Sequence, residues 1–247
     1  MVSFFKVSRF RLLAAFAVGA QLLLAQAEPA PALTPERRAD IFMARKMYRE
    51  ALEMYLQAPR DSAVIWNKMG IAYHQMMDLN QAKKHYEKAL KINPKYPEAI
   101  NNLGTVHYAK KSYRRAINQY KKALKVAPLS ASVHSNLGTA YFARKKYKDA
   151  LKAYGQALAI DPEVFEHRSS HGVMLQERSV EERAKFHYYL ARTYAAAGLF
   201  DRAILYLRKA LEEGFRERDR IMKEPEFAAL HEIAEFQQLM AAEPRVL

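Results

Sequence analysis

The residues best suited to chemistry in this sequence are its eight histidines, because the chain contains no cysteine. Catalysis needs a nucleophile, an acid–base pair or a metal cluster held close together. His167 and His171 are four residues apart, a spacing that resembles a pair of metal ligands. The adjacent Gly172 and two serines disfavour a helix there, and the sequence fixes no third ligand. The other histidines are His74, His85, His107, His134, His187 and His231.

Sequence motifs of known chemistry are absent. The chain has no glycine-rich phosphate loop, no nucleophile elbow and no His-Glu-x-x-His zinc motif. The lack of cysteine also excludes disulfides, thiolate metal sites and a cysteine nucleophile. We therefore predict no catalytic residue, no metal site, no cofactor and no small-molecule substrate. An enzyme that uses His167 and His171 is the least favoured alternative.

The central part of the chain repeats with a period of 34 residues. The segment "NLGTVHYAKKSYRRAINQYKKALKVAP" (102–128) is followed by "NLGTAYFARKKYKDALKAYGQALAIDP" (136–162). Three consecutive units align without insertion or deletion, and a fixed period of this size indicates a solenoid of stacked units. The positions in register are Gly70, Gly104 and Gly138; Ala82, Ala116 and Ala150; Tyr86, Tyr120 and Tyr154; Ala89, Ala123 and Ala157; and Pro94, Pro128 and Pro162.

Each unit is predicted to form a helix, a turn and a second helix. Apolar residues three or four apart give the first helix a buried stripe. The glycine lets another helix approach closely, and the tyrosine fills the space between units. The proline ends the second helix, because it lacks an N–H and pushes the preceding residue out of helical conformation. One unit cannot bury its apolar face alone and must stack on its neighbours. In this register His107 and His134 take the positions of packed core residues.

These units resemble the tetratricopeptide repeat family. The segment "WNKMGIAYHQMMDLNQAKKHYEKALKINP" (66–94) carries the large residue, Gly, Tyr, Ala, aromatic residue, Ala and Pro of that family at the expected offsets. The sequence departs from the family at Met77, Lys111 and Lys145, where the family favours Gly in the turn. The resemblance implies an all-α fold, a right-handed superhelical solenoid of stacked helix–turn–helix repeats with a C-terminal helical cap.

The repeats divide the chain into eight predicted segments. These are a signal peptide (1–27), a linker with a degenerate first repeat (28–62), three full repeats (63–96, 97–130 and 131–164), an insert (165–183), a further degenerate repeat (184–214) and a C-terminal helical cap (215–247). The "RSSHG" stretch of the insert is predicted to be irregular, with a helix beginning near Val180 behind the N-cap Ser179 and a capping-box Glu182. The apolar side of the cap is predicted to contain Phe227, Leu230, Ile233, Phe236 and Leu239.

The N-terminal segment has the order of a secretory signal. Lys6, Arg9 and Arg11 precede an apolar run over 12–25, and the small residues of "AQA" (25–27) follow it. We predict cleavage near Ala27 and export to the periplasm or the extracellular space. An uncleaved membrane anchor is the alternative, although the run is shorter than the roughly 20 residues that span a bilayer.

First helices form the concave side of a superhelix of this kind, and such grooves bind extended peptides or partner helices. Amides in the groove offer donors and acceptors to a peptide backbone, and aromatic rings offer apolar area. By register, the predicted groove residues are Asn67, Ile71, His74, Asn101, Asn102, Thr105, Tyr108, Asn136, Thr139 and Phe142.

The positive charge of the chain is concentrated in the central repeats. Residues 83–152 contain 17 Lys and Arg against three acidic residues, a net charge of +14. By register these side chains lie on the outer, convex side, where they are either solvated or dock an anionic partner. The predicted basic patch consists of Lys83, Lys84, Arg114, Arg115, Lys121, Lys122, Lys145, Lys146 and Lys148.

The sequence as a whole favours a non-enzymatic scaffold of a bacterial-type cell envelope or of the secreted space, which binds a protein or peptide in its concave groove. The alternative is a polyanion or anionic membrane-surface binder that uses the basic convex face. Nucleic acid is disfavoured as a partner, because export separates the protein from most of it.

Overall fold

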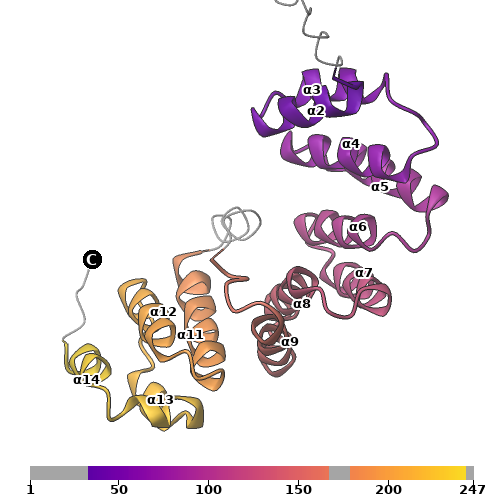
Figure 1. The fold of residues 1–247 in the computed structure, drawn as a ribbon. Helices are drawn as coiled ribbons and strands as arrows, with labels where there is room; N and C mark the ends of the chain where they lie inside the picture. Colours follow the sequence, from indigo (N-terminus) through magenta and orange to yellow (C-terminus); the bar gives the residue numbers. More distant parts are fainter. Residues whose placement is uncertain (1–32, 167–178, 243–247) are drawn as a thin grey trace, which may run out of the picture.

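The computed structural model describes residues 33–166 and 179–242, and in these residues it contains helices and no strand (Figure 1). Five helix pairs follow one another along the chain. They are α2 (Pro35–Ala44) with α3 (Tyr48–Tyr55), α4 (Ala63–Gln75) with α5 (Leu79–Ile92), α6 (Pro97–Ala109) with α7 (Tyr113–Val126), α8 (Ala131–Ala143) with α9 (Tyr147–Ile160), and α11 (Val180–Ala196) with α12 (Phe200–Glu212). Helix α13 (Arg218–Lys223), the 3₁₀ helix η1 (Pro225–Leu230) and helix α14 (Ala234–Ala241) complete the described chain.

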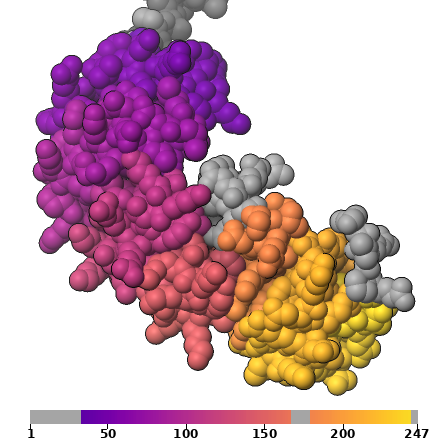
Figure 2. Space-filling model, turned by 180° about the vertical axis from the view of Figure 1, so that it is seen from behind, coloured from indigo at the N-terminus to yellow at the C-terminus, as the bar shows by residue number. Residues whose placement is uncertain are grey.

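The pairs stack in sequence order. Within a pair the two helices pack on each other, and the first helix of each later pair also packs on the second helix of the pair before it. Figure 2 shows the resulting stack as a curved body with the first pairs at one end and the C-terminal helices at the other. The predicted all-α solenoid of stacked helix pairs is therefore confirmed.

A glycine–tyrosine contact holds each full repeat together. A Cβ atom on Gly104 would lie 2.5 Å from Cε1 of the Tyr120 ring, and one on Gly70 would lie equally close to Tyr86. The glycine thus admits the ring of the second helix of its own repeat. Tyr86 also belongs to a buried cluster with Leu103 of the next repeat, so the tyrosine fills the space within and between units.

Each first helix from α2 to α11 ends in a turn with a left-handed residue. The backbone N–H of Lys111 donates to the Tyr108 carbonyl (2.8 Å) and that of Ser112 donates to the His107 carbonyl (2.8 Å), which is the pattern of a Schellman motif. The left-handed residues are Lys46, Met77, Lys111 and Lys145, with φ between 56° and 62°, and Gly198 with φ 74°.

Helix α11 begins where the sequence predicted. The Ser179 side chain accepts a hydrogen bond of 3.1 Å from the backbone N–H of Glu182, and the first helical residue is Val180. Helix α9 ends at Ile160, so no continuous helix joins the two. The "RSSHG" stretch lies outside the described residues.

The C-terminal helices cover the last pair. Phe227, Leu230 and Phe236 are buried, and Ile233 and Leu239 pack against the same cluster, so the predicted apolar side is confirmed. Segment η1 packs on α11. These helices follow the last pair and bury part of its apolar surface, as expected of a cap.

Candidate binding groove and basic surface

The first helices lie on the inner side of the curved stack. Helices α4, α6 and α8 contact one another from repeat to repeat, whereas α5, α7 and α9 are held further apart. Helices on the inner side of a curved stack lie closer together than those on its outer side. The concave side is therefore built by α4, α6 and α8, as the register predicted.

Asparagine amides bridge these three helices. The Nδ2 of Asn102 donates to Oδ1 of Asn67 across α6 and α4 (3.0 Å), and the Nδ2 of Asn136 donates to Oδ1 of Asn101 across α8 and α6 (3.0 Å). Asn67 and Asn136 are only 4% exposed. Their prediction as groove-lining residues is corrected, because their amides join neighbouring repeats and have little surface to offer a partner.

Thr139 and Phe142 are also buried, against the prediction that they line the open groove. The Thr139 hydroxyl donates to the Ser135 carbonyl (3.1 Å) and accepts from the Tyr154 hydroxyl (3.3 Å). The Phe142 ring packs edge-on against Phe186 of α11 at a centroid distance of 5.5 Å.

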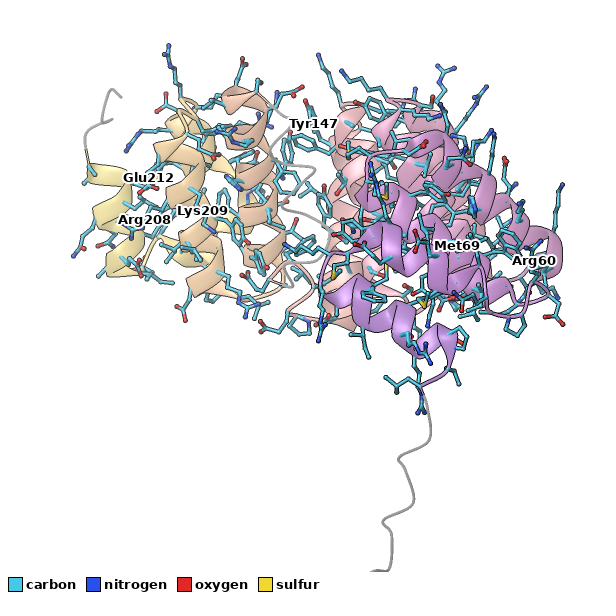
Figure 3. All side chains as sticks on the ribbon, turned by 90° about the horizontal axis from the view of Figure 1, so that it is seen from above. Arg60, Met69, Tyr147, Arg208, Lys209 and Glu212 are labelled. Atoms are coloured by element: carbon cyan, nitrogen blue, oxygen red, sulfur yellow. The ribbon has the colours of Figure 1, made fainter. Side chains whose placement is uncertain are left out.

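The contact between α8–α9 and α11 continues through a further aromatic pair. Tyr147 of α9 stacks on Tyr189 of α11 with ring centroids 4.6 Å apart, and Figure 3 shows Tyr147 between the two groups of helices. The Phe142 ring also lies 5.9 Å from Tyr189. Phe142 and Tyr147 thus hold the last helix pair onto the stack.

The remaining predicted groove residues are half-buried and lie on α4 and α6 alone. The Thr105 hydroxyl donates to the Asn102 carbonyl (2.8 Å), and the Tyr108 ring packs against Tyr113 at 5.2 Å. Burial lowers the pKa of His74, so this ring is neutral at pH 7. The accessible groove residues are Ile71, His74, Asn101, Asn102, Thr105 and Tyr108.

A charged cluster at the N-terminal end of the groove was not predicted. Lys68 Nζ lies 2.8 Å from a Glu36 oxygen and 2.7 Å from an Asp40 oxygen, and the Tyr55 hydroxyl donates to Asp40 (2.6 Å). Burial lowers the pKa of Lys68, but its hydrogen bonds to Asp40 and Glu36 together raise the pKa by more than burial lowers it. The net shift of the pKa is therefore upward. Asp40 follows Ala39 as Ile71 follows Gly70, but the offset between these pairs is 31 residues and not 34, so the period of the full repeats did not indicate the contact.

The predicted basic patch lies on the second helices and on the turns before them. All nine of its side chains are exposed except Lys83, which is half-buried. Two of them form ion pairs within the described chain, Lys83 with Glu87 (3.4 Å) and Lys146 with Asp149 (3.9 Å).

The histidines that the structure describes differ in burial and in their partners, and Nδ1 of His187 lies 2.7 Å from a Glu213 oxygen. His134 is buried, with Nε2 2.9 Å from the Pro128 carbonyl, as a core position requires. His107 is only half-buried, so its prediction as a core residue is corrected. The pKa of its ring is lowered by burial and by the nearby positive charges of Lys83 and Arg115. No group of three His, Asp or Glu in residues 33–166 and 179–242 could hold a metal, and His167 and His171 lie outside these ranges.

None of the helices described is long and apolar enough to cross a membrane.

Comparisons with known proteins agree with this architecture. Two models of the tetratricopeptide repeat family match the sequence, one over residues 61–129 and the other over 102–164 and 175–215. Together these matches cover more than half of the chain. No curated protein matches it.

Solved structures of MamA proteins have a similar fold. MamA 41-end from Desulfovibrio magneticus RS-1 is 21% identical with a TM-score of 0.51, and the match covers 77% of this chain and 96% of that one. A MamA RS-1 ArsTM double mutant is 22% identical with a TM-score of 0.51, covering 75% of this chain and 94% of that one. A third MamA crystal structure is 20% identical with a TM-score of 0.50, covering 77% and 93%. At these identities the likeness shows a shared fold.

Proposed function

Because the chain belongs to the tetratricopeptide repeat family, whose members are generally protein-interaction scaffolds, we propose that it is a non-enzymatic scaffold that binds an extended peptide segment of a protein partner. The binding site is the accessible groove of α4 and α6. Its residues combine amide, hydroxyl and aromatic groups on two adjacent helices. An extended peptide needs such a combination, because its backbone requires hydrogen-bond partners and its side chains require apolar contact.

One observation carries this proposal. The Asn102 side chain is held by Asn67 of the preceding repeat, and the Thr105 hydroxyl is held by the Asn102 carbonyl. These hydrogen bonds fix the polar groups of the groove before a partner arrives, so that little side-chain entropy is lost on binding. The half-buried Tyr108 lies one turn further along the same helix and offers a rigid apolar anchor.

We propose that the scaffold works outside the cytoplasm, in a bacterial-type cell envelope or in the secreted space. The support is the basic, apolar and small-residue order of residues 1–27, which lie outside the described residues. The intact mass of the protein recovered from its own cells tests this location. A chain beginning near Glu28 is expected, and a retained Met1 would contradict cleavage.

Site-specific photo-crosslinking tests the groove. A benzoylphenylalanine at position 108 should capture the partner in the native cells, whereas the same residue at position 114, exposed on α7, should not. Tyr108→Ala should then weaken binding of the captured partner about tenfold, mainly through faster dissociation. Capture from position 114 alone, or an unchanged affinity of Tyr108→Ala, would exclude the groove as the binding site.

A further inference from the structure

Exposed aliphatic side chains lie where the second helices of the first two full repeats end. Ile92 is the last residue of α5 and is 43% exposed, and Val126 is the last residue of α7 and is 41% exposed. Leu129, in the loop that follows α7, is 79% exposed, the largest value among the large apolar side chains of the described residues. The fold buries none of the three, although comparable aliphatic residues elsewhere in these repeats are in the core.

An open groove lies between these two repeats, and the last turns of α5 and α7 contribute to its lining. Its volume is about 430 Å³. Leu90, Pro94, Ile100 and Leu103 supply apolar lining from one repeat and its neighbour. The opposite wall belongs to α7, whose Lys122, Lys125 and Val126 line the groove. Val126 is therefore part of an apolar depression, and Ile92 and Leu129 lie within three residues of its lining residues in the sequence.

Lysines surround this apolar surface. Lys122 and Val126 are four residues apart on α7, as are Lys88 and Ile92 on α5, so Val126 and Ile92 each share a helix face with a lysine. No ion pair to a carboxylate is formed by any of these lysines within residues 33–166 and 179–242. We call the whole surface the edge patch; it consists of Lys88, Lys91, Ile92, Lys95, Lys122, Lys125, Val126 and Leu129.

We propose that the edge patch docks on the surface of an anionic lipid bilayer, with its aliphatic groups inserted below the headgroups and its lysines at the phosphate level. A long lysine side chain keeps its ammonium group at the interface while its methylene stem lies in the apolar layer. Attraction to anionic lipids and burial of apolar area together determine the strength of such interfacial binding. A bilayer thus satisfies both kinds of side chain in the edge patch.

A hydrophilic polyanion is the weaker fit. It would neutralise the lysines but leave Ile92, Val126 and Leu129 in water. The third repeat shows that the feature is local: Ile160 ends α9 there, but Glu163 takes the position of Lys95 and Leu129. Bilayer docking through the edge patch also leaves the concave groove of α4 and α6 open to a partner.

Co-sedimentation of the full protein with lipid vesicles tests the proposal. The protein should bind vesicles of phosphatidylcholine containing about a third phosphatidylglycerol and not vesicles of phosphatidylcholine alone. Lys122→Gln with Lys125→Gln should lower the partition coefficient about 25-fold, since each lysine near an anionic surface contributes a factor of about five. Leu129→Ser should lower it about tenfold without any change of charge.

Matched variants between Leu205 and Lys223, near the C-terminal end, serve as controls. Arg216→Gln with Lys223→Gln removes two exposed positive charges there, and Leu205→Ser removes an aliphatic side chain that is 43% exposed. Both should bind the vesicles as the unchanged protein does. Every variant carries the same N-terminal segment, so vesicle binding through that segment would be equal in all variants. Equal binding by the edge-patch variants and the control variants would overturn the proposal.

Heparin distinguishes the bilayer from a polyanion. Leu129→Ser should bind heparin as well as the unchanged protein does while losing affinity for the vesicles. If Leu129→Ser leaves vesicle binding unchanged while the lysine variants weaken both, the surface recognises negative charge alone and the bilayer proposal is wrong. A protein that does not bind the phosphatidylglycerol vesicles at all also overturns it.

Discussion

At the scale of single residues, the turns between helices contain strain that the sequence does not relieve. Lys111 has a φ of 56°, in the left-handed region that costs a residue with a Cβ about 1–2 kcal/mol. Glycine avoids this cost but loses about 0.5–1 kcal/mol through its flexibility in the unfolded chain. Lys111→Gly should therefore raise the free energy of unfolding by about 0.5–1 kcal/mol, measured by chemical denaturation.

The reverse change supplies the control. Gly198 occupies the same turn position in the last pair with a φ of 74°, and a Cβ added there would meet no atom within 4 Å. Gly198→Lys should therefore destabilise the protein by a similar amount through backbone strain alone. Shifts of the same sign in both variants would show that side-chain contacts, not φ, decide the stability of these turns.

The sequence predicted only in part which residues line the groove. The register predicted Asn102 and Tyr108 on the concave side, because the period of 34 fixes which face a residue occupies, and both are half-buried on α6. It could not predict that Phe142 is buried, since its neighbour Phe186 lies beyond the insert, where the period is broken. The Glu36–Lys68 contact was missed because the first pair is out of register by three residues.

At the scale of helices, close approach within a repeat depends on one glycine. Gly104→Ala would place a Cβ 2.5 Å from the Tyr120 ring, which is fully buried and cannot move aside. We expect the overpacking to cost about 1–3 kcal/mol, which exceeds the gain of up to about 1 kcal/mol in helix propensity. The midpoint of chemical denaturation should fall accordingly.

Gly155 of α9 is the matched control for this substitution. It also lies within a helix, but a Cβ added there meets no atom within 4 Å. Gly155→Ala should therefore raise stability by about 0.5–1 kcal/mol through helix propensity alone. Were Gly104→Ala to stabilise the protein as well, close helix packing would not be the reason for the glycine.

Most of the helices could be predicted because each repeat carries its own start and stop signals. Ser179 marked the beginning of α11 even though the period is broken before it. The ends of the first helices were harder, because Met77 and Lys111 stand where a glycine would have signalled a left-handed turn. The backbone hydrogen bonds of the Schellman motif impose that conformation on residues that do not prefer it.

At the scale of the whole molecule, the stack is nearly one-dimensional, because each helix pair contacts mainly its neighbours. Stability in such a protein is the sum of local terms, and its two ends respond separately to perturbation. The C-terminal end is held by Glu224, which accepts from the Tyr188 hydroxyl (2.5 Å) and lies 2.9 Å from Arg192. The N-terminal end contains the only tryptophan, Trp66.

Acid below pH 4.5 should therefore loosen the C-terminal end first. Burial raises the pKa of Glu224. Hydrogen bonds from Tyr188 and Arg220 and the charge of Arg192 lower the pKa by more than burial raises it, so the net pKa is below the usual 4.5. A carboxylate with a lowered pKa in the folded state binds protons more weakly there than in the unfolded state. Its contribution to stability is complete above pH 4.5 and is lost as the pH falls through the lower folded pKa.

Glu224→Gln should reproduce this loss at neutral pH, at a cost of about 1–3 kcal/mol, because it removes the charge that Arg192 and Arg220 face. Circular dichroism should show earlier loss of helix in denaturant, while the emission of Trp66 should keep its original midpoint. The same separation should appear in the unchanged protein when the pH is lowered below 4.5. Equal shifts of both signals would mean that the stack unfolds as one cooperative unit, and that contacts between neighbouring repeats are strong enough to transmit the loss of the cap along its whole length.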